Sequence, residues 1–169
     1  MLRELLRPDW LLETTLAELP LQTLLDRKIR ALVLDVDRTL LPRRQSVLPE
    51  AARRWLNHAK TRLPIHLLSN NPSRKRIGDV ARELDLPFTT SAGKPRRTAL
   101  RRVLKQLGLP HGQVALVGDR VFTDVIAGNR LGLFTVLVKP IDPSGLPCRQ
   151  DRLQRLELHL ARWIGSPLG

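Results

Sequence analysis

The feature that most constrains the fold is a repeated alternation between short apolar runs and segments with helical periodicity. Four runs are almost wholly apolar, which is typical of strands that are covered on both faces of a parallel sheet. A fifth run is shorter and gives a weaker strand signal. The four runs span residues 30–36, 64–69, 113–119 and 133–139, and the fifth spans residues 87–91.

Between these runs, apolar side chains recur at the three- and four-residue spacing of amphipathic helices. These helical patterns span residues 49–61, 73–84, 95–108 and 122–132. Strands that alternate with short helices predict an α/β fold: a three-layer, Rossmann-like parallel sheet with right-handed crossovers and helices on both faces. A chain of 169 residues suits a single domain, which we expect to span residues 1–169 with its core at 30–139.

Two leucine-rich segments flank this core, and both predict helices. Residues 1–28 are expected to form a helical extension interrupted at Pro8 and Pro20, and residues 150–164 a C-terminal helix. The C-terminal segment places four apolar side chains on one helical face: Leu153, Leu156, Leu160 and Trp163. We expect both segments to pack on the sheet or on each other, and an amphipathic surface anchor is the alternative.

Polar side chains stand where the predicted strands end. Asp35, Ser69, Lys94 and Asp119 each lie at, or just after, such an end. The carboxyl ends of parallel strands meet at one rim of the sheet, where ligands bind in α/β proteins. Each residue alone has an ordinary structural interpretation, as a turn aspartate, a helix cap or a solvated lysine. Their joint placement at one rim favours a functional site.

Four short motifs at this rim resemble, in order and spacing, those of the haloacid dehalogenase (HAD) superfamily of phosphohydrolases. The motifs are "DVDRT" with Asp35, Asp37 and Thr39, "LLSNN" with Ser69, Asn70 and Asn71, "AGKP" with Lys94, and "GDRVFTD" with Asp119 and Asp124. The longer matches "LDVDRTL" and "GDRVFTDVIAGNRLG" make the chain most similar to the small YqeG-type phosphatases of subclass IIIA. Arg38 departs from the usual asparagine of that group, and Arg120 from a common glutamine.

This resemblance implies a Mg²⁺ cofactor and a role for each motif residue. Mg²⁺ would be held by Asp35, the main-chain carbonyl of Asp37, and Asp119, with Asp124 behind these ligands or completing the site through water. Asp35 would attack phosphorus to give an aspartyl-phosphate, and Asp37 would serve as general acid and then base. The remaining roles fall on Ser69 and Lys94, which would bind the phosphoryl group, and on the substrate-binding residues Thr39, Asn70, Asn71, Arg43 and Arg44.

The spacing of the motifs leaves no room for a cap domain, so the site is expected to be open. Residues 40–48 allow only a short loop, and residues 70–93 are filled by one helix and a weak strand. An open site can accept a phosphate carried on something large, such as a lipid in a bilayer. A related branch of the resembled family, in plastids and fungal mitochondria, acts on phosphatidylglycerophosphate.

The net charge of +13 favours an anionic partner. Many arginines fall on the expected rim, where planar guanidinium groups suit phosphate oxygens: Arg38, Arg43, Arg44, Arg74, Arg76, Arg96, Arg97 and Arg120. The preferred hypothesis is a Mg²⁺-dependent phosphomonoester hydrolase that acts on a phosphatidylglycerophosphate-type lipid at an anionic membrane surface. The alternatives are a phosphatase of a soluble small molecule and a basic module that binds RNA or ribosomes, although aromatic residues make up only 4% of the chain.

The sequence also bears on location. No apolar run is long enough to cross a membrane, and acidic residues and Pro8 interrupt any signal-peptide pattern near the N-terminus. The single cysteine, Cys148, can form no internal disulfide. These features favour a cytoplasmic protein, peripheral to the inner face of the membrane if its substrate is a lipid.

Overall fold

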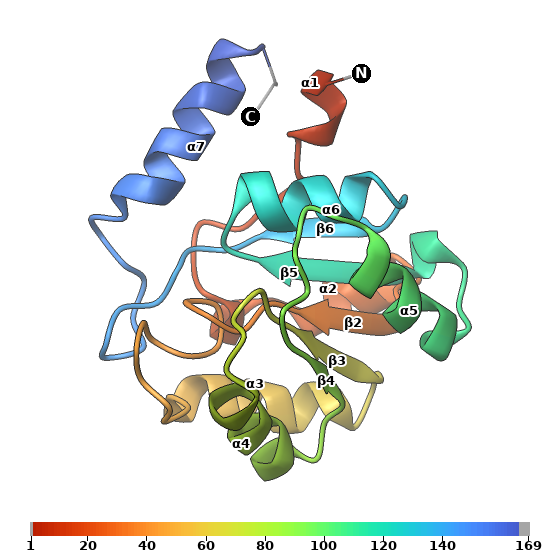
Figure 1. Ribbon diagram of the computed structural model, residues 1–169, viewed down its shortest axis with the longest axis vertical. Helices are drawn as coiled ribbons and strands as arrows, with labels where there is room; N and C mark the ends of the chain where they lie inside the picture. The colour runs from red at the N-terminus through yellow and green to blue at the C-terminus, as the bar shows by residue number, and fades with distance from the viewer. Residues whose placement is uncertain (1, 166–169) are drawn as a thin grey trace.

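The computed structural model describes residues 2–165, and its centre is a six-stranded sheet in which every neighbouring pair of strands is parallel (Figure 1). The strand order is β1-β6-β5-β2-β3-β4. The strands are β1 (Trp10–Leu11), β2 (Ala31–Leu34), β3 (Ile65–Leu68), β4 (Phe88–Thr89), β5 (Val114–Gly118) and β6 (Phe134–Leu137). The predicted Rossmann-like α/β class is therefore confirmed, and the five expected strands all form.

The helices that connect and flank these strands are short. They are α1 (Leu2–Leu5), α2 (Leu21–Asp26), α3 (Glu50–Lys60), α4 (Arg74–Leu84), α5 (Thr98–Leu107), α6 (Ile126–Asn129) and α7 (Arg152–Trp163). Two 3₁₀ turns, Leu16–Glu18 and His111–Gln113, and a π-helical turn at Val121–Val125 complete the elements of residues 2–165. None of these helices has the length and apolar character that spanning a bilayer requires.

Alternation along the central strands divides the core into two layers, one on each face of the sheet. On β2, Leu32 and Leu34 face one side of the sheet, where they pack with apolar residues of α2, α3 and α4. Ala31 and Val33 face the other side, together with apolar residues of α5 and α6. Because both faces are covered, all four residues of β2 are buried. The core therefore fixes β2 at the centre of the molecule, with its carboxyl end open to the rim.

Helix boundaries differ from the predicted ones where the rim needs irregular backbone. The helix expected from residue 95 begins at Thr98, because residues 93–96 form a turn in which Arg96 N donates to Gly93 O at 2.9 Å. The helix expected over 122–132 is the π-helical turn Val121–Val125 followed by the short α6. The first irregular segment contains Lys94 of the predicted site, and the second lies just after Asp119.

The prediction that the apolar stripe of the C-terminal helix packs into the protein is wrong. The side chains that α7 buries are Gln154, Glu157 and Ala161. The stripe faces outward: Leu153, Leu156, Leu160 and Trp163 are 40%, 54%, 37% and 82% exposed. Hydrophobic periodicity identifies a face of a helix but not its partner, and here hydrogen bonds made by the polar residues orient the helix.

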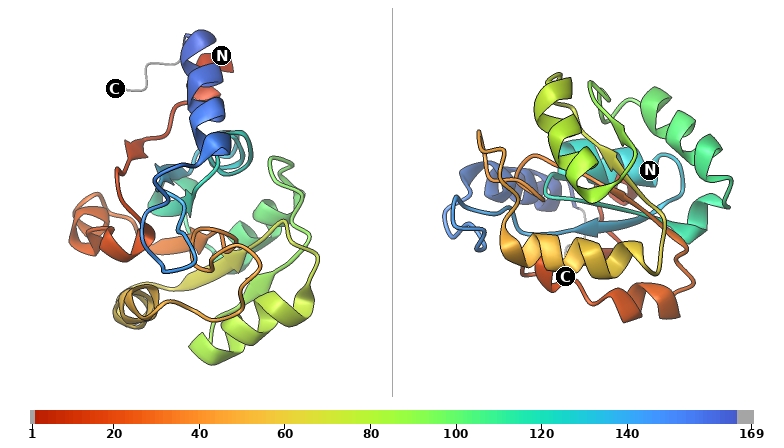
Figure 2. Two further views of the ribbon diagram at one scale, coloured as in Figure 1. Left: turned by 90° about the vertical axis from the view of Figure 1, so that its left-hand side faces the viewer. Right: turned by 90° about the horizontal axis from the view of Figure 1, so that it is seen from below.

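The N-terminal segment also contains a strand that the sequence analysis missed. Trp10 and Leu11 pair with Val136 and Leu137 at the edge of the sheet. Two residues are too few to show a strand pattern, and the pairing depends on a neighbour far along the chain. Beyond this strand, α1 lies beside the C-terminal end of α7 in both views (Figures 1 and 2). Leu6 accordingly packs with Ala161 of α7.

Candidate active site

The candidate site lies at the carboxyl ends of β2, β3 and β5. The chain leaves β2 toward β3 on one side and later returns as β5 on the other, and ligands bind at such switch points in open α/β sheets. A small hollow of about 130 Å³ opens there. It is lined by Asp35, Asp37, Arg38, Asn70, Lys94, Asp119, Arg120 and Thr123. The topology thus brings together residues from all four predicted motifs.

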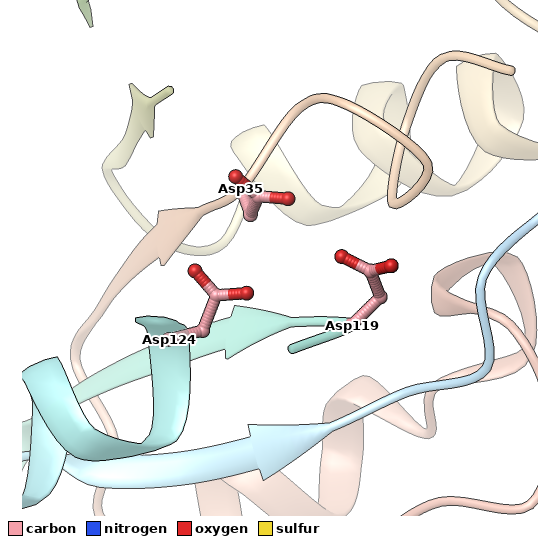
Figure 3. Close-up of side chains that lie close together, drawn as sticks. All are labelled: Asp35, Asp119 and Asp124. Carbon is pink, nitrogen blue, oxygen red and sulfur yellow. The ribbon is translucent and has the colours of Figure 1, made fainter. Parts of the chain in front are cut away.

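Three buried carboxylates form the floor of the site (Figure 3). Asp35 follows β2, Asp119 follows β5, and Asp124 lies on the π-helical turn. One carboxylate oxygen from each lies within 4.8 Å of the other two. Oxygen-only donors at this separation suit a hard divalent cation such as Mg²⁺.

A buried oxygen without a hydrogen bond supports this interpretation. Oδ2 of Asp119 accepts no hydrogen bond from residues 2–165, although the side chain is buried. The Nε atom of Arg38 lies 3.8 Å away, which is beyond hydrogen-bonding distance. An unsatisfied buried carboxylate oxygen is costly, and a bound cation would satisfy it. The residues present therefore fit a metal ion.

Burial and mutual repulsion raise the pKa values of two carboxyl groups of the cluster, those of Asp35 and Asp119. Burial, opposed by Lys94 and reinforced by Asp124, raises the pKa of Asp35 to about 6. Burial and the nearby charges of Asp35 and Asp124 also raise the pKa of Asp119. Carboxyl groups whose pKa values are raised by burial and by one another do not stabilise the fold. Their presence at one place is therefore typical of a functional site.

Lys94 joins two of the carboxylates. Its Nζ donates to Asp35 Oδ1 at 2.7 Å, to Asp124 Oδ1 at 2.6 Å and to Leu68 O at 3.0 Å. Burial alone would lower the pKa of Lys94, but Asp124 and Asp35 together raise it above its ordinary value. Asn70 fixes the lysine main chain, since Asn70 Oδ1 accepts from Lys94 N at 2.8 Å and Asn70 Nδ2 donates to Lys94 O at 3.0 Å. The ammonium group is therefore charged and rigidly placed.

Gly118 lets Asp124 approach the end of β5. A Cβ atom at position 118 would lie 2.3 Å from the carboxylate carbon of Asp124, far inside van der Waals contact. The space that the glycine leaves is filled by the carboxylate, whose Oδ2 also accepts from Arg120 N at 3.1 Å. The glycine of the GD motif is thus required by packing and not by backbone conformation.

A second group of contacts orders Asp37 and Asp35. Ser69 Oγ donates to Asp37 Oδ2 at 3.1 Å, and Arg76 forms an ion pair with the same carboxylate. Thr39 Oγ1 donates to Asp35 Oδ2 at 3.2 Å. Arg76 is one of the arginines expected at the rim, and Asp37 is a partner that the sequence did not predict for it. Asp37 is one-third exposed, so it borders both the buried carboxylates and solvent.

Arg38, which replaces the usual asparagine of the resembled group, has a defined position. Its backbone is left-handed, with φ of 68°, in the turn after β2. The guanidinium group lies between Asp119 and Asp151, and it forms an ion pair with the latter. Arg38 therefore connects the carboxylate cluster to Asp151, the residue that caps the N-terminus of α7.

The buried polar face of α7 holds the loop that carries Asp119. Gln154 Nε2 donates to Asp119 O and to Val138 O, both at 2.8 Å. Glu157 accepts from Val121 N at 2.8 Å and from Arg120 Nε at 2.7 Å. Neither Gln154 nor Glu157 was predicted from the sequence as part of the site, because the helical pattern of this segment draws attention to its apolar face alone. Polar residues on the face opposite an apolar stripe carry no signal that distinguishes them from solvated ones.

Four predicted substrate-binding residues, Thr39, Asn71, Arg43 and Arg44, do not line the hollow. Thr39 is buried and donates to Asp35. Asn71 N donates to Ser69 Oγ at 3.0 Å, and Asn71 Oδ1 accepts from Ser73 N at 2.8 Å, so this residue shapes the turn before α4. Arg43 and Arg44 are exposed on the loop between β2 and α3. Arg43 lines a neighbouring hollow that shares Arg38 with the candidate site.

Comparisons with known proteins agree with this geometry. A family model described as HAD-hydrolase-like matches residues 91–140. The chain is 30% identical over 146 residues to the probable phosphatase YqeG of Bacillus subtilis, covering 85% of this chain and 83% of that protein. It is 42% identical over 76 residues to phosphatidylglycerophosphate phosphatase 1, chloroplastic/mitochondrial, of Arabidopsis thaliana, covering 44% of this chain and 22% of that protein.

A solved structure shares the fold. A HAD-superfamily hydrolase of subfamily IA from Geobacter sulfurreducens matches with a TM-score of 0.55 and 16% identity, over 78% of this chain and 99% of the other. A parallel sheet with paired aspartates after its central strand, a buried lysine and an acidic loop defines a phosphohydrolase of the HAD class. Within that class, the chain belongs to the family of YqeG-type phosphatases.

Proposed function

We propose that this phosphatase hydrolyses phosphomonoesters through an aspartyl-phosphate on Asp35, and that its substrate is a phosphatidylglycerophosphate-type lipid. The observation that carries the catalytic part is the position of Asp35. Its carboxylate borders the hollow and is oriented by Lys94 and Thr39. A nucleophile needs this combination of access and fixed orientation.

The first step transfers the phosphoryl group to the enzyme. A carboxylate oxygen of Asp35 attacks phosphorus, and the bond from phosphorus to the leaving oxygen breaks. Asp37, two residues further on, gives its proton to that oxygen, so that an alcohol leaves. Ser69 holds the carboxyl group of Asp37 in place at 3.1 Å. Lys94 supplies positive charge next to Asp35.

The second step releases phosphate. Water attacks the phosphorus of the aspartyl-phosphate, Asp37 takes a proton from that water, and the carboxylate of Asp35 is regenerated. Asp35 and Asp119 would hold Mg²⁺, with the main-chain carbonyl of Asp37 and with Asp124 close by. Bound there, the ion would supply positive charge that offsets the negative charge of the phosphate oxygens.

Three observations support a lipid substrate. The Arabidopsis relative carries the name of a phosphatidylglycerophosphate phosphatase. Within residues 2–165, the loops that follow β2 and β3 carry no cap domain, so a large substrate can reach the site. Arg38 and Arg120 line the hollow and can bind the phosphodiester of such a lipid, while its terminal phosphomonoester is hydrolysed. A membrane-peripheral location would follow from this substrate.

A substrate panel tests the proposal. Purified protein with Mg²⁺ should release phosphate from phosphatidylglycerophosphate in detergent micelles more efficiently, by about tenfold or more in kcat/KM, than from glycerol 3-phosphate or a chromogenic ester. The lipid and its soluble analogue share the scissile phosphate, so the difference measures recognition of the rest of the lipid. Good turnover of soluble esters with no release from the lipid would refute the lipid substrate and leave the phosphatase chemistry intact.

A further inference from the structure

Helix α7 presents three different faces along its length. On a helical period of 3.6 residues, the buried residues Gln154, Glu157 and Ala161 occupy one arc. A second arc carries only apolar side chains and a third carries basic ones. The apolar arc consists of Leu153, Leu156, Leu160 and Trp163, and the basic arc of Arg152, Arg155, His159 and Arg162.

The apolar arc is exposed to an extent that is unusual for a folded domain. Its least exposed member, Leu160, is 37% exposed, and Trp163 is 82% exposed. Residues 2–165 contain seven exposed large apolar side chains, and four of them lie on this arc. Single exposed apolar residues are common on folded proteins, but a contiguous stripe marks an interaction surface.

The charge of α7 indicates what kind of partner the stripe contacts. All members of the basic arc are exposed. Glu157 is the acidic residue of the helix, and it is buried and paired with Arg120 and Val121. The exposed surface of α7 is therefore apolar and cationic. A second copy of this helix would bring like charges together, whereas an anionic surface with an apolar interior complements both arcs.

We propose that α7 docks on a bilayer containing anionic lipids, with its apolar arc in the interface and its arginines among the headgroups. Aromatic and leucine side chains enter the boundary between headgroups and acyl chains, and nearby basic residues are attracted to an anionic leaflet. The helix lies along one edge of the molecule, away from the sheet, which leaves its outer side free for such contact (Figures 1 and 2).

The docking surface begins at the mouth of the candidate site. Leu153, the first residue of the apolar arc, lines a hollow of about 470 Å³ together with Arg38, Arg43 and Arg152. Arg38 also lines the active-site hollow. The bilayer contact and the catalytic rim are therefore continuous, and a headgroup phosphate at the membrane surface would meet arginines first.

The buried face of α7 links this docking surface to the loop that carries Asp119. Gln154 and Glu157 hold the main chain from Asp119 to Val121. A helix that docks on the membrane would consequently fix the carboxylate cluster at a set depth and orientation relative to the lipid. Only this consequence rests on the proposed lipid substrate; the docking itself does not.

Vesicle flotation of the full chain tests the docking surface. The wild type should float with phosphatidylcholine vesicles that contain phosphatidylglycerol, and less with phosphatidylcholine alone or at high salt. The double variant Leu156→Ser/Trp163→Ser leaves the charge unchanged and should bind at least about tenfold more weakly. Unchanged flotation of this variant would overturn the proposal.

A matched pair of charge variants separates the basic arc from net charge. Arg152→Gln/Arg155→Gln and Arg101→Gln/Arg102→Gln remove the same charge, the first from α7 and the second from exposed positions on α5. Only the α7 pair should abolish the preference for phosphatidylglycerol. Equal losses from both pairs would contradict a specific surface. Sedimentation that shows a dimer of the wild type, dissociated by the Leu156/Trp163 variant, would assign the stripe to self-association instead.

Two further measurements separate docking from the proposed substrate. Hydrolysis of a chromogenic ester should be unchanged in all these variants, which also verifies that they fold. Phosphatidylglycerophosphate hydrolysis should fall for the Leu156/Trp163 variant in vesicles but not in detergent micelles. Flotation without any lipid hydrolysis would uphold docking and refute the lipid substrate. Hydrolysis in micelles without flotation would uphold the lipid substrate and refute docking.

Discussion

The Nζ atom of Lys94 lies 2.7 Å from Oδ1 of Asp35, and the two residues are 59 positions apart in the chain. Both side chains are buried, and the lysine also contacts Asp124. This pair joins the end of β2 to the turn before α5. It offsets part of the negative charge of the carboxylate cluster and sets the orientation of the proposed nucleophile.

Replacing Lys94 by methionine should damage both stability and catalysis. The substitution leaves Asp35 and Asp124 buried beside each other without their cation, which costs about 3–5 kcal/mol in typical buried pairs. Phosphatase turnover should fall by about 100-fold or more, because the positive charge next to the transferring group is lost. Urea unfolding and chromogenic ester hydrolysis measure the two effects. Turnover within a few fold of wild type would show that Lys94 is structural only.

The proposed metal site predicts that Asp119→Asn changes stability in opposite directions with and without Mg²⁺. In metal-free protein, Asp119→Asn should raise the melting temperature by several degrees, since it removes a buried charge that faces Asp35 and Asp124. A gain of about 1 kcal/mol corresponds to about 2–4 °C for a domain of this size. Mg²⁺ should stabilise the wild type and not the variant. A variant that Mg²⁺ stabilises as strongly as the wild type would place the ion elsewhere.

Glu157 acts as a positioning residue for the Asp119 loop. Glu157→Leu removes the acceptor for Val121 N and the partner of Arg120, so the apparent Mg²⁺ affinity should weaken by about tenfold or more. The Mg²⁺ concentration that gives half-maximal ester hydrolysis measures this. Glu83→Gln, which breaks an exposed ion pair with Arg53, is the control and should leave that concentration unchanged. A purely structural role would lower the melting temperature without shifting the Mg²⁺ dependence.

His66 should make stability depend on pH. Burial in β3 lowers its pKa below the ordinary value of 6.5, and Thr89 Oγ1 lies 2.9 Å from its Nε2. The folded state therefore binds fewer protons than the unfolded state just below pH 6.5, so the free energy of unfolding falls as the pH drops below that value. Denaturant unfolding from about pH 5 to 8 should show a smaller decrease for His66→Gln than for the wild type. Parallel curves for the two proteins would refute this contribution.

The central fold and the composition of the site could be predicted because each follows from local patterns. Runs buried on both faces located β2, β3, β5 and β6, since a short segment that is continuously apolar and bounded by turn residues is typical of a covered strand. Parallel topology then required that Asp35 and Asp119 meet at one rim. The residue types of the cluster follow from the motifs. The hydrogen bonds of Lys94 to two carboxylates depend on the three-dimensional structure and could not be predicted.

The orientation of α7 could not be predicted, because it depends on contacts with a distant part of the chain and not on a local pattern. Its apolar stripe is a strong periodic signal, and such stripes usually face a core. Here Gln154 and Glu157 satisfy main-chain groups of the Asp119 loop, 35 and 36 residues away, and these bonds turn the stripe outward. Pairings of this kind depend on three-dimensional placement and leave no trace in periodicity. The contacts of Arg38 with Asp119 and Asp151 could not be predicted from the sequence for the same reason.

The central claim is that Asp35 is the nucleophile, and the most direct test compares Mg²⁺-dependent phosphate release by the wild type and by Asp35→Asn. The amide keeps the shape of the side chain and can still accept from Lys94, so the variant should melt as a folded protein. We predict that the wild type hydrolyses a chromogenic phosphate ester only with Mg²⁺ and that the folded variant shows no turnover above background. Retained turnover by the folded variant would contradict the account.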